Sequence, residues 1–252
     1  MNLIRAWLVC VSVFGWPAAS MAQQFDVLLF TKTAGWHHDA INAGVNAIEH
    51  LGRKHHFSVS WTENADIVFK DEELAKYEVI IFLLTTGDAL NDQQQAAMER
   101  FMRSGKGFVG VHSASDTEYK WDWYTAMVGH MFQRHPHIQT ATVKVENPNF
   151  PGMDRFAPRF LITDEWYEFD ASRSKNLKYL LSIDESTYET TPPRKKEADR
   201  FHPLSWYQEY DGGRAFYTAL GHVPEMYTDQ SFLHHIYGGI YWAATGRGFK
   251  AQ

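Results

Sequence analysis

Short apolar runs alternate with amphipathic segments through the first half of the chain. The runs span residues 25–31, 57–61, 79–84 and 107–112. The run VIIFLL at 79–84 contains no polar residue, which is typical of a strand that is covered on both faces. Between the runs, apolar residues recur at helical spacing, as at Ile41, Val45, Ile48 and Leu51. This alternation predicts an α/β fold with a parallel, doubly wound sheet.

The second half of the chain has a different pattern. Residues 140–146 alternate between apolar and polar, and residues 204–220 predict a hairpin that turns at Asp211-Gly212-Gly213. An apolar helix is expected over 230–244, and surface loops are expected at 147–159 and 185–203. We therefore expect an antiparallel extension beside the parallel strands.

The first 22 residues predict a secretory signal peptide. Arg5 is followed by an apolar stretch, and Ser20-Met21-Ala22 precedes Gln23. The expected location is the periplasm or the extracellular space. Cys10 is the only cysteine and lies in this leader, so the mature chain is expected to have no disulfide, thiolate metal site or cysteine nucleophile.

Residues 23–252 predict a single domain, since no linker, repeat or low-complexity block divides them. Without Arg5, 23 of the 24 basic residues remain against 30 acidic residues, so nucleic acid is not an expected partner. No further segment has the roughly 20 apolar residues that a membrane span needs. The 13 histidines and 15% aromatic residues suit a sugar-facing or metal-binding surface, and an aromatic-rich surface is compatible with a homodimer.

Histidines follow three of the predicted strands. His38 comes after the first run, His112 ends the run at 107–112, and His222 follows the predicted hairpin. Ligands of open α/β sheets bind outside the carboxyl ends of the strands, so these imidazoles are expected to converge. Each has an alternative role, because His37 or His38 could cap the next helix and His222 could be a hydrogen-bonded structural residue.

His112 stands at the apex of Val109-Gly110-Val111-His112-Ser113-Ala114, a strand-to-helix turn like that of a nucleophile elbow. Imidazole at this position favours metal binding or general acid–base chemistry. Asp116 could orient His112 or contact sugar hydroxyls, or it could be a helix N-cap. The histidine pairs at 55–56 and 234–235 are expected to be solvated.

Several motifs together resemble the ThuA-like, trehalose-utilisation family. They are GWHHDAI, GKGFVGVHSASDT, WYTAMVGHMFQRHP, DEWYEF, LLSIDESTY and GGRAFYTALGHVPEMY, which extend over nearly the whole mature chain. The resemblance implies a class I glutamine amidotransferase-like fold, that is, a flavodoxin-like three-layer sandwich. In amidotransferases a cysteine occupies the elbow and a histidine and a glutamate follow later. Here His112 is at the elbow position and Glu225 comes three residues after His222, so amidotransferase activity is not expected.

The resemblance implies a carbohydrate substrate, either a glycoside or a 3-keto-glycoside that is hydrolysed or undergoes elimination. His38, His112 and His222 are the expected ligands of a divalent metal such as zinc or the acid–base groups, with Glu165 as a fourth ligand or the base. Asp116 is a further catalytic candidate. The side chains expected to stack on sugar are those of Trp36, Trp121, Trp166 and Tyr167.

Two alternatives remain open: a non-catalytic sugar- or metal-binding protein, and a degenerate amidotransferase-like scaffold with an occluded elbow. No glycine-rich phosphate loop is present, so no nucleotide cofactor is expected. His135, in the family's HP motif, is expected to have a structural role in its loop.

Overall fold

A computed structural model describes residues 23–190 and 200–249. The predicted signal peptide at 1–22 therefore lies outside the described residues, as does part of the loop predicted at 185–203. Within the described ranges, no helix is long and apolar enough to cross a membrane.

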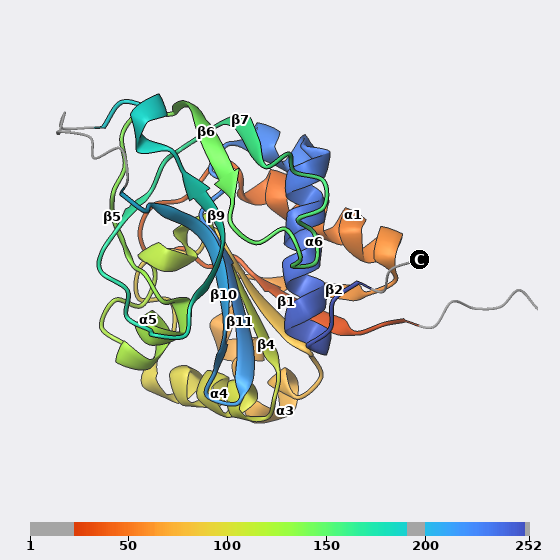
Figure 1. Cartoon of the computed structure of the whole chain (residues 1–252). Coiled ribbons are helices and arrows are strands. Elements are labelled where there is room, and N and C mark those ends of the chain that lie inside the picture. Colours follow the sequence, from red (N-terminus) through yellow and green to blue (C-terminus); the bar gives the residue numbers. More distant parts are fainter. Residues whose placement is uncertain (1–22, 191–199, 250–252) are drawn as a thin grey trace, which may run out of the picture.

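A nine-stranded sheet forms the centre of the described part of the chain (Figure 1). Five neighbouring strands are parallel, in the order β2 (Ser58–Thr62), β1 (Asp26–Phe30), β3 (Val79–Leu83), β4 (Gly107–Val111) and β11 (Gly213–Thr218). The sheet continues through antiparallel neighbours β10 (Pro203–Tyr210), β9 (Lys178–Ile183), β6 (Gln139–Val145) and β7 (Arg159–Asp164). A separate pair is formed by β5 (Phe132–Arg134) and β8 (Glu168–Phe169). The expected parallel sheet with an antiparallel extension is confirmed.

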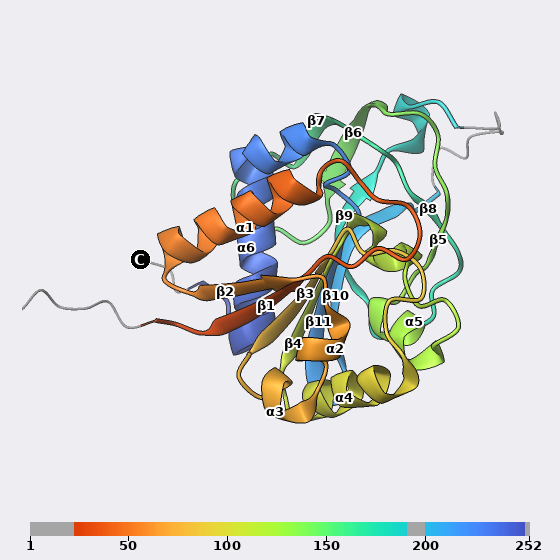
Figure 2. The same ribbon diagram turned by 180° about the vertical axis from the view of Figure 1, so that it is seen from behind.

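Helices cover both faces of the parallel half, which gives the three-layer sandwich that the resemblance implied (Figure 1 and Figure 2). One face carries α1 (Ile41–His55) and α6 (Gln230–Thr245). The other face carries α2 (Ala65–Val68), α3 (Asp71–Leu74), α4 (Asp92–Arg103) and α5 (Asp122–Val128). Asn91 caps α4 with a capping box: its side chain accepts from the N–H groups of Gln93 and Gln94, and its own N–H donates to the Gln94 side chain.

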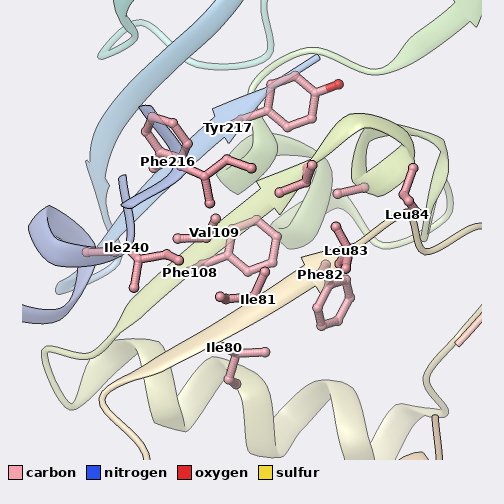
Figure 3. Packing of buried hydrophobic residues seen from close by; sticks show 14 of the residues in the cluster. Ile80, Ile81, Phe82, Leu83, Leu84, Phe108, Val109, Phe216, Tyr217 and Ile240 are labelled. Atoms are coloured by element: carbon pink, nitrogen blue, oxygen red, sulfur yellow. The ribbon is translucent and has the colours of Figure 1, made fainter. Parts of the chain in front are cut away.

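The central strands are buried because both of their faces are covered. Every residue of β3 and β4 is buried, as the unbroken apolar runs predicted. Phe82 and Phe108 lie 5.4 Å apart between ring centroids and pack with Tyr124 of α5, while Val109 and Phe216 lie nearby in the same core (Figure 3). Burying each such side chain contributes roughly 1.5–3 kcal/mol, so this core fixes the strand ends that carry the site.

One prediction about the surface was wrong. His235 was expected to be solvated, but it is completely buried on α6, and its Nε2 lies 3.0 Å from Ser205 Oγ. The reason is that α6 packs against β11 and β4 and is itself covered in part, so it has an apolar surface on more than one side. The strands β5, β7, β8 and β9 were not predicted.

Candidate active site

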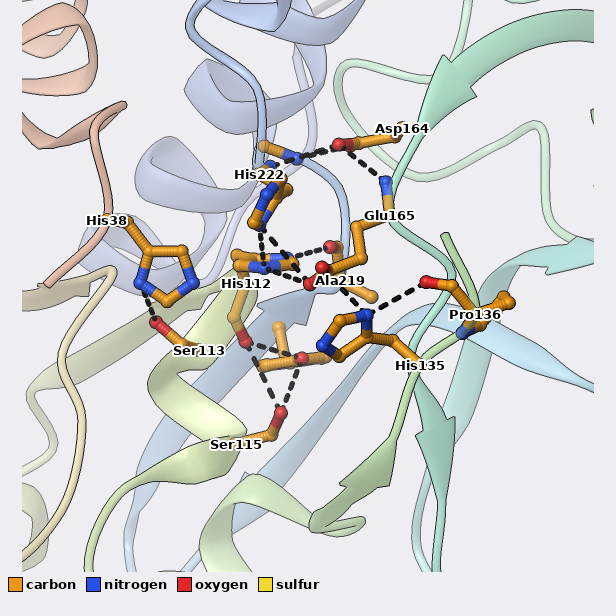
Figure 4. A network of polar contacts seen from close by, with 12 residues as sticks. His38, His112, Ser113, Ser115, His135, Pro136, Asp164, Glu165, Ala219 and His222 are labelled. Atoms are coloured by element: carbon orange, nitrogen blue, oxygen red, sulfur yellow. Dashed lines mark hydrogen bonds and ion pairs between the residues drawn. The ribbon is translucent and has the colours of Figure 1, made fainter. Parts of the chain in front are cut away.

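Three histidines from three strand ends meet at one edge of the sheet (Figure 4). His38 lies in the loop after β1, His112 directly follows β4, and His222 follows β11. One nitrogen from each ring lies within 4.8 Å of the other two. None of the three is a helix cap: the N-cap of α1 is Ala40, which makes no side-chain capping bond. The convergence expected from the sequence is therefore present.

His112 has a backbone conformation that side chains rarely adopt, with φ of 50°. Tyr217 holds this turn, because its hydroxyl donates to the His112 carbonyl at 2.7 Å. The Nδ1 of His112 lies 2.7 Å from the carbonyl oxygen of Ala219. A carbonyl only accepts, so Nδ1 carries the hydrogen and the neutral ring presents a lone pair at Nε2. This Nε2 faces His222, whose Nδ1 is 3.1 Å away.

The histidine cluster is held neutral by its surroundings. Burial, together with the neighbouring His112 and His222, lowers the pKa of His38 to about 3. Burial also lowers the pKa of His112 to about 3 and that of His222 to about 4. Neutral imidazoles have free lone pairs for a metal ion.

The chemistry and spacing of these donors fit a divalent transition metal. Zinc is held by imidazole nitrogens at about 2.0–2.1 Å, so neighbouring ligands of a tetrahedral site lie about 3.3 Å apart. The 3.1 Å between His112 Nε2 and His222 Nδ1 is close to that separation, and His38 lies within 4.8 Å of both. The ring of His112 is oriented by the Ala219 carbonyl, as is usual for metal-binding histidines.

Glu165 joins the cluster from the end of β7. Its Oε2 lies 3.4 Å from His112 Nε2 and 3.2 Å from His222 Nδ1, and its Oε1 lies 2.9 Å from His135 Nδ1. Burial raises the pKa of this carboxyl, while His222 and His135 oppose the shift. Glu165 thus connects the buried histidines to a fourth one, His135.

Asp164 is a supporting residue that sequence reasoning missed. This side chain is completely buried. Its two oxygens accept from the backbone N–H groups of Gly221 at 2.7 Å, His222 at 3.1 Å and Glu165 at 3.0 Å (Figure 4). Burial raises its pKa to about 7 against the effect of these donors. Asp164 therefore ties the His222 loop to the end of β7.

A pocket of about 430 Å³ opens onto these residues. Its lining consists of Trp36, His38, Asp116, Phe132, His135, Glu165, Tyr167 and His222. Trp36 is 72% exposed, and the Tyr167 ring lies against His112 with centroids 4.1 Å apart. Six of the nine residues selected from the sequence thus line one pocket, and His112 lies beside it.

Two of the selected aromatic residues lie elsewhere. Trp121 is buried against Trp123 and donates its indole N–H to Glu99. Trp166 is completely buried and donates to the Gln139 carbonyl. Neither side chain is part of the pocket lining, so Trp36 and Tyr167 are the two of the four selected aromatic residues that line the pocket.

The placement of two polar residues departs from the sequence reasoning. Asp116 is not a helix N-cap, because it ends the 3₁₀ turn His112–Asp116 and the N-cap of α5 is Trp121. It accepts from the Tyr119 hydroxyl, and burial raises its pKa. His135, expected to have only a structural role in its loop, lines the pocket and contacts Glu165. The HP motif that contains it was the feature of the sequence that could have identified it as a site residue.

Solved structures share this fold. A ThuA-like protein from Bacteroides uniformis ATCC 8492 is 22% identical with a TM-score of 0.73, covering 91% of this chain and 95% of that one. One from Parabacteroides merdae ATCC 43184 is 17% identical with the same TM-score, covering 91% and 93%. A β-galactosidase from Rahnella sp. R3 is 13% identical with a TM-score of 0.57, and the match covers 88% of this chain and 32% of that one.

No curated protein matches the chain. The sequence model of the trehalose-utilisation family, ThuA, matches residues 26–243, which include all the histidines of the site and Glu165. The chain therefore belongs to the ThuA, trehalose-utilisation family.

Proposed function

We propose that this protein is a carbohydrate-active enzyme that cleaves glycosides or 3-keto-glycosides at a metal-binding histidine site. The observation that carries the proposal is the meeting of His38, His112 and His222 beside Glu165 in an aromatic-walled pocket. Neutral buried imidazoles with a carboxylate at the same pocket wall supply both a metal site and a base.

The three histidines would hold a divalent ion such as zinc. Such an ion polarises a carbonyl oxygen when it is bound, which increases the acidity of the neighbouring C–H bond. The chain's own contribution is to keep the three rings neutral through burial and to orient His112 through the Ala219 carbonyl. Asp164 orients the His222 loop.

Glu165 is the base in this proposal. In a 3-keto-glycoside the hydrogen on C2 is acidic, because the carbonyl at C3 accepts the electron pair that its removal leaves. Glu165 takes this hydrogen, the C1–O bond to the aglycone breaks, and a C1–C2 double bond forms while the C3 carbonyl is restored. If water then adds at C1, the net reaction is hydrolysis; if no water adds, the net reaction is elimination.

The pocket walls suit a sugar ring. Trp36 is exposed at the pocket, and Phe132 and Tyr167 provide further aromatic surface. Aromatic faces pack against the apolar C–H face of a pyranose, and Asp116 offers a carboxylate to its hydroxyls. A volume of about 430 Å³ lies within the usual range for small-molecule sites.

Export is part of the proposal. Its support is the signal-peptide pattern of residues 1–22, with Arg5 before the apolar stretch and Ser20-Met21-Ala22 before Gln23. N-terminal sequencing of the protein recovered from the periplasmic fraction of an expressing cell tests it. A mature chain that begins at Gln23 is the expected result, and an uncleaved cytoplasmic chain would contradict it.

The first experiment is elemental analysis of the purified protein after zinc is supplied. We expect a near-stoichiometric metal in the wild type and its loss in His38→Ala and His112→Ala. His37→Ala is the matched control, because His37 is the adjacent histidine, is exposed and lies outside the cluster. Absence of metal from the wild type, or equal loss in His37→Ala, would overturn the metal site.

Turnover is tested with p-nitrophenyl 3-keto-β-D-glucoside and with the unoxidised glucoside. Glu165→Gln is expected to lower kcat by roughly 10²–10⁴, the usual contribution of a positioned base. If the wild type binds these sugars and cleaves neither, the chain is a sugar-binding protein and the catalytic proposal fails.

A further inference from the structure

His135 differs from the other histidines of the site in its exposure. Its side chain is 44% exposed and lines the pocket, whereas His38 is 4% exposed and His112 is completely buried. A group that gives a proton to a substrate and regains it from water must reach both. Of the four histidines around Glu165, His135 meets this requirement best.

The hydrogen bonds of His135 determine which of its nitrogens is available. Its Nδ1 donates to the Pro136 carbonyl oxygen at 2.8 Å, and Glu165 Oε1 lies 2.9 Å from the same nitrogen, at ion-pair distance (Figure 4). Both partners are acceptors, so Nδ1 carries a hydrogen. Nε2 has no hydrogen-bond partner in the part of the chain that the structure describes, and it is therefore the nitrogen that can exchange a proton with a ligand.

The ring is also fixed in place. It packs against Phe132 with centroids 5.9 Å apart and against Tyr167 at 6.2 Å. An acceptor that holds one nitrogen, here the Pro136 carbonyl, while the other nitrogen stays open to a ligand is the arrangement that orients a catalytic imidazole in hydrolases.

We propose that His135 is the general acid of the reaction and protonates the oxygen of the leaving aglycone. This inference rests on the proposed function. Glu165 takes the C2 hydrogen as a proton, the electron pair of the C1–O bond moves to the aglycone oxygen, and this oxygen takes the proton of His135 Nε2. The aglycone leaves as a neutral alcohol. The proton on Glu165 returns to His135 through water in the open pocket, which restores both groups.

The test compares leaving groups that differ in their need for a proton. A p-nitrophenolate ion leaves unaided, whereas a methoxide ion does not. We expect His135→Ala to lower kcat on methyl 3-keto-β-D-glucoside by roughly a hundredfold or more and to change the p-nitrophenyl reaction little. Imidazole added to the assay is expected to restore part of the lost rate, because the pocket is open. Zinc content is expected to be unchanged.

His137→Ala is the matched control, since His137 is an exposed histidine of the same loop and does not line the pocket. An equal loss on both substrates, or no loss on the methyl glycoside, would overturn the role of His135 while leaving the proposed function intact. If the wild type cleaves neither keto-glycoside, the proposed function itself has failed. Circular dichroism of each variant separates these outcomes from misfolding.

Discussion

Replacing Asp164 by asparagine tests whether this buried carboxylate supports the site. The side chain is completely buried, and its two oxygens accept three backbone N–H groups, one at Oδ2 and two at Oδ1. Asparagine has one accepting oxygen, and its NH₂ group would face N–H donors. Either one or two donors then lose their acceptor, and each buried donor without a partner costs about 1–3 kcal/mol.

The expected loss of unfolding free energy is therefore about 1–6 kcal/mol for Asp164→Asn, or a decrease in Tm of roughly 2–24 °C for a domain of this size. Urea denaturation at pH 8 or above, where the Asp164 carboxyl with its raised pKa of about 7 is mostly ionised, measures the loss by tryptophan fluorescence. Asp154→Asn is the control, because Asp154 is exposed and its change is expected to stay within about 0.5 kcal/mol. A loss below about 1 kcal/mol in Asp164→Asn would refute the reasoning.

Further tests concern the buried His235, the close packing at Gly238 and the proposed metal site. Burial lowers the pKa of His235 to about 3, so below pH 6.5 the unfolded chain binds more protons than the folded chain and stability falls. In urea denaturation, the stability of His235→Gln should therefore fall by about 2 kcal/mol less than that of the wild type between pH 7 and pH 5. Gly238→Ala should cost about 1–3 kcal/mol in the same assay, because a Cβ would lie 2.0 Å from the Pro151 carbonyl oxygen, whereas Gly248→Ala meets nothing within 4 Å and should be neutral. Zinc at a hundred times its Kd should stabilise the wild type by about 2.7 kcal/mol in thermal denaturation and leave His38→Ala unchanged.

The parallel half of the fold could be predicted from sequence because its strands are buried on both faces. Such strands appear as unbroken apolar runs, as in VIIFLL, and the predicted runs agree with β1, β2, β3 and β4 to within about two residues. His38, His112 and His222 could be selected for the same reason, since each follows a strand or hairpin with a clear pattern.

The extension was harder to predict because its strands are only partly buried. In β7, exposed and half-buried positions alternate, and Leu161 is 72% exposed, so no apolar run marks the strand. Burial of His235 likewise depends on what packs around α6, which periodicity does not report. Asp164 gave no signal at all, because a carboxylate that binds backbone N–H groups is recognised only when the partners are in place.

Strand direction explains how residues from both halves reach one site. β10 is antiparallel to β11, β9 to β10, β6 to β9 and β7 to β6, so β7 runs in the same direction as β11, β4 and β1. The carboxyl end of β7, where Glu165 follows, therefore lies at the same edge as the ends that precede His112 and His222. β6 runs the opposite way, so the loop before it, which holds His135, lies at that edge too. The strand direction alternates four times between β11 and β7, which places Glu165 and His135 beside the cluster. Because β7 and β9 were not recognised in the sequence, these alternations, and hence the position of Glu165, could not be worked out from it.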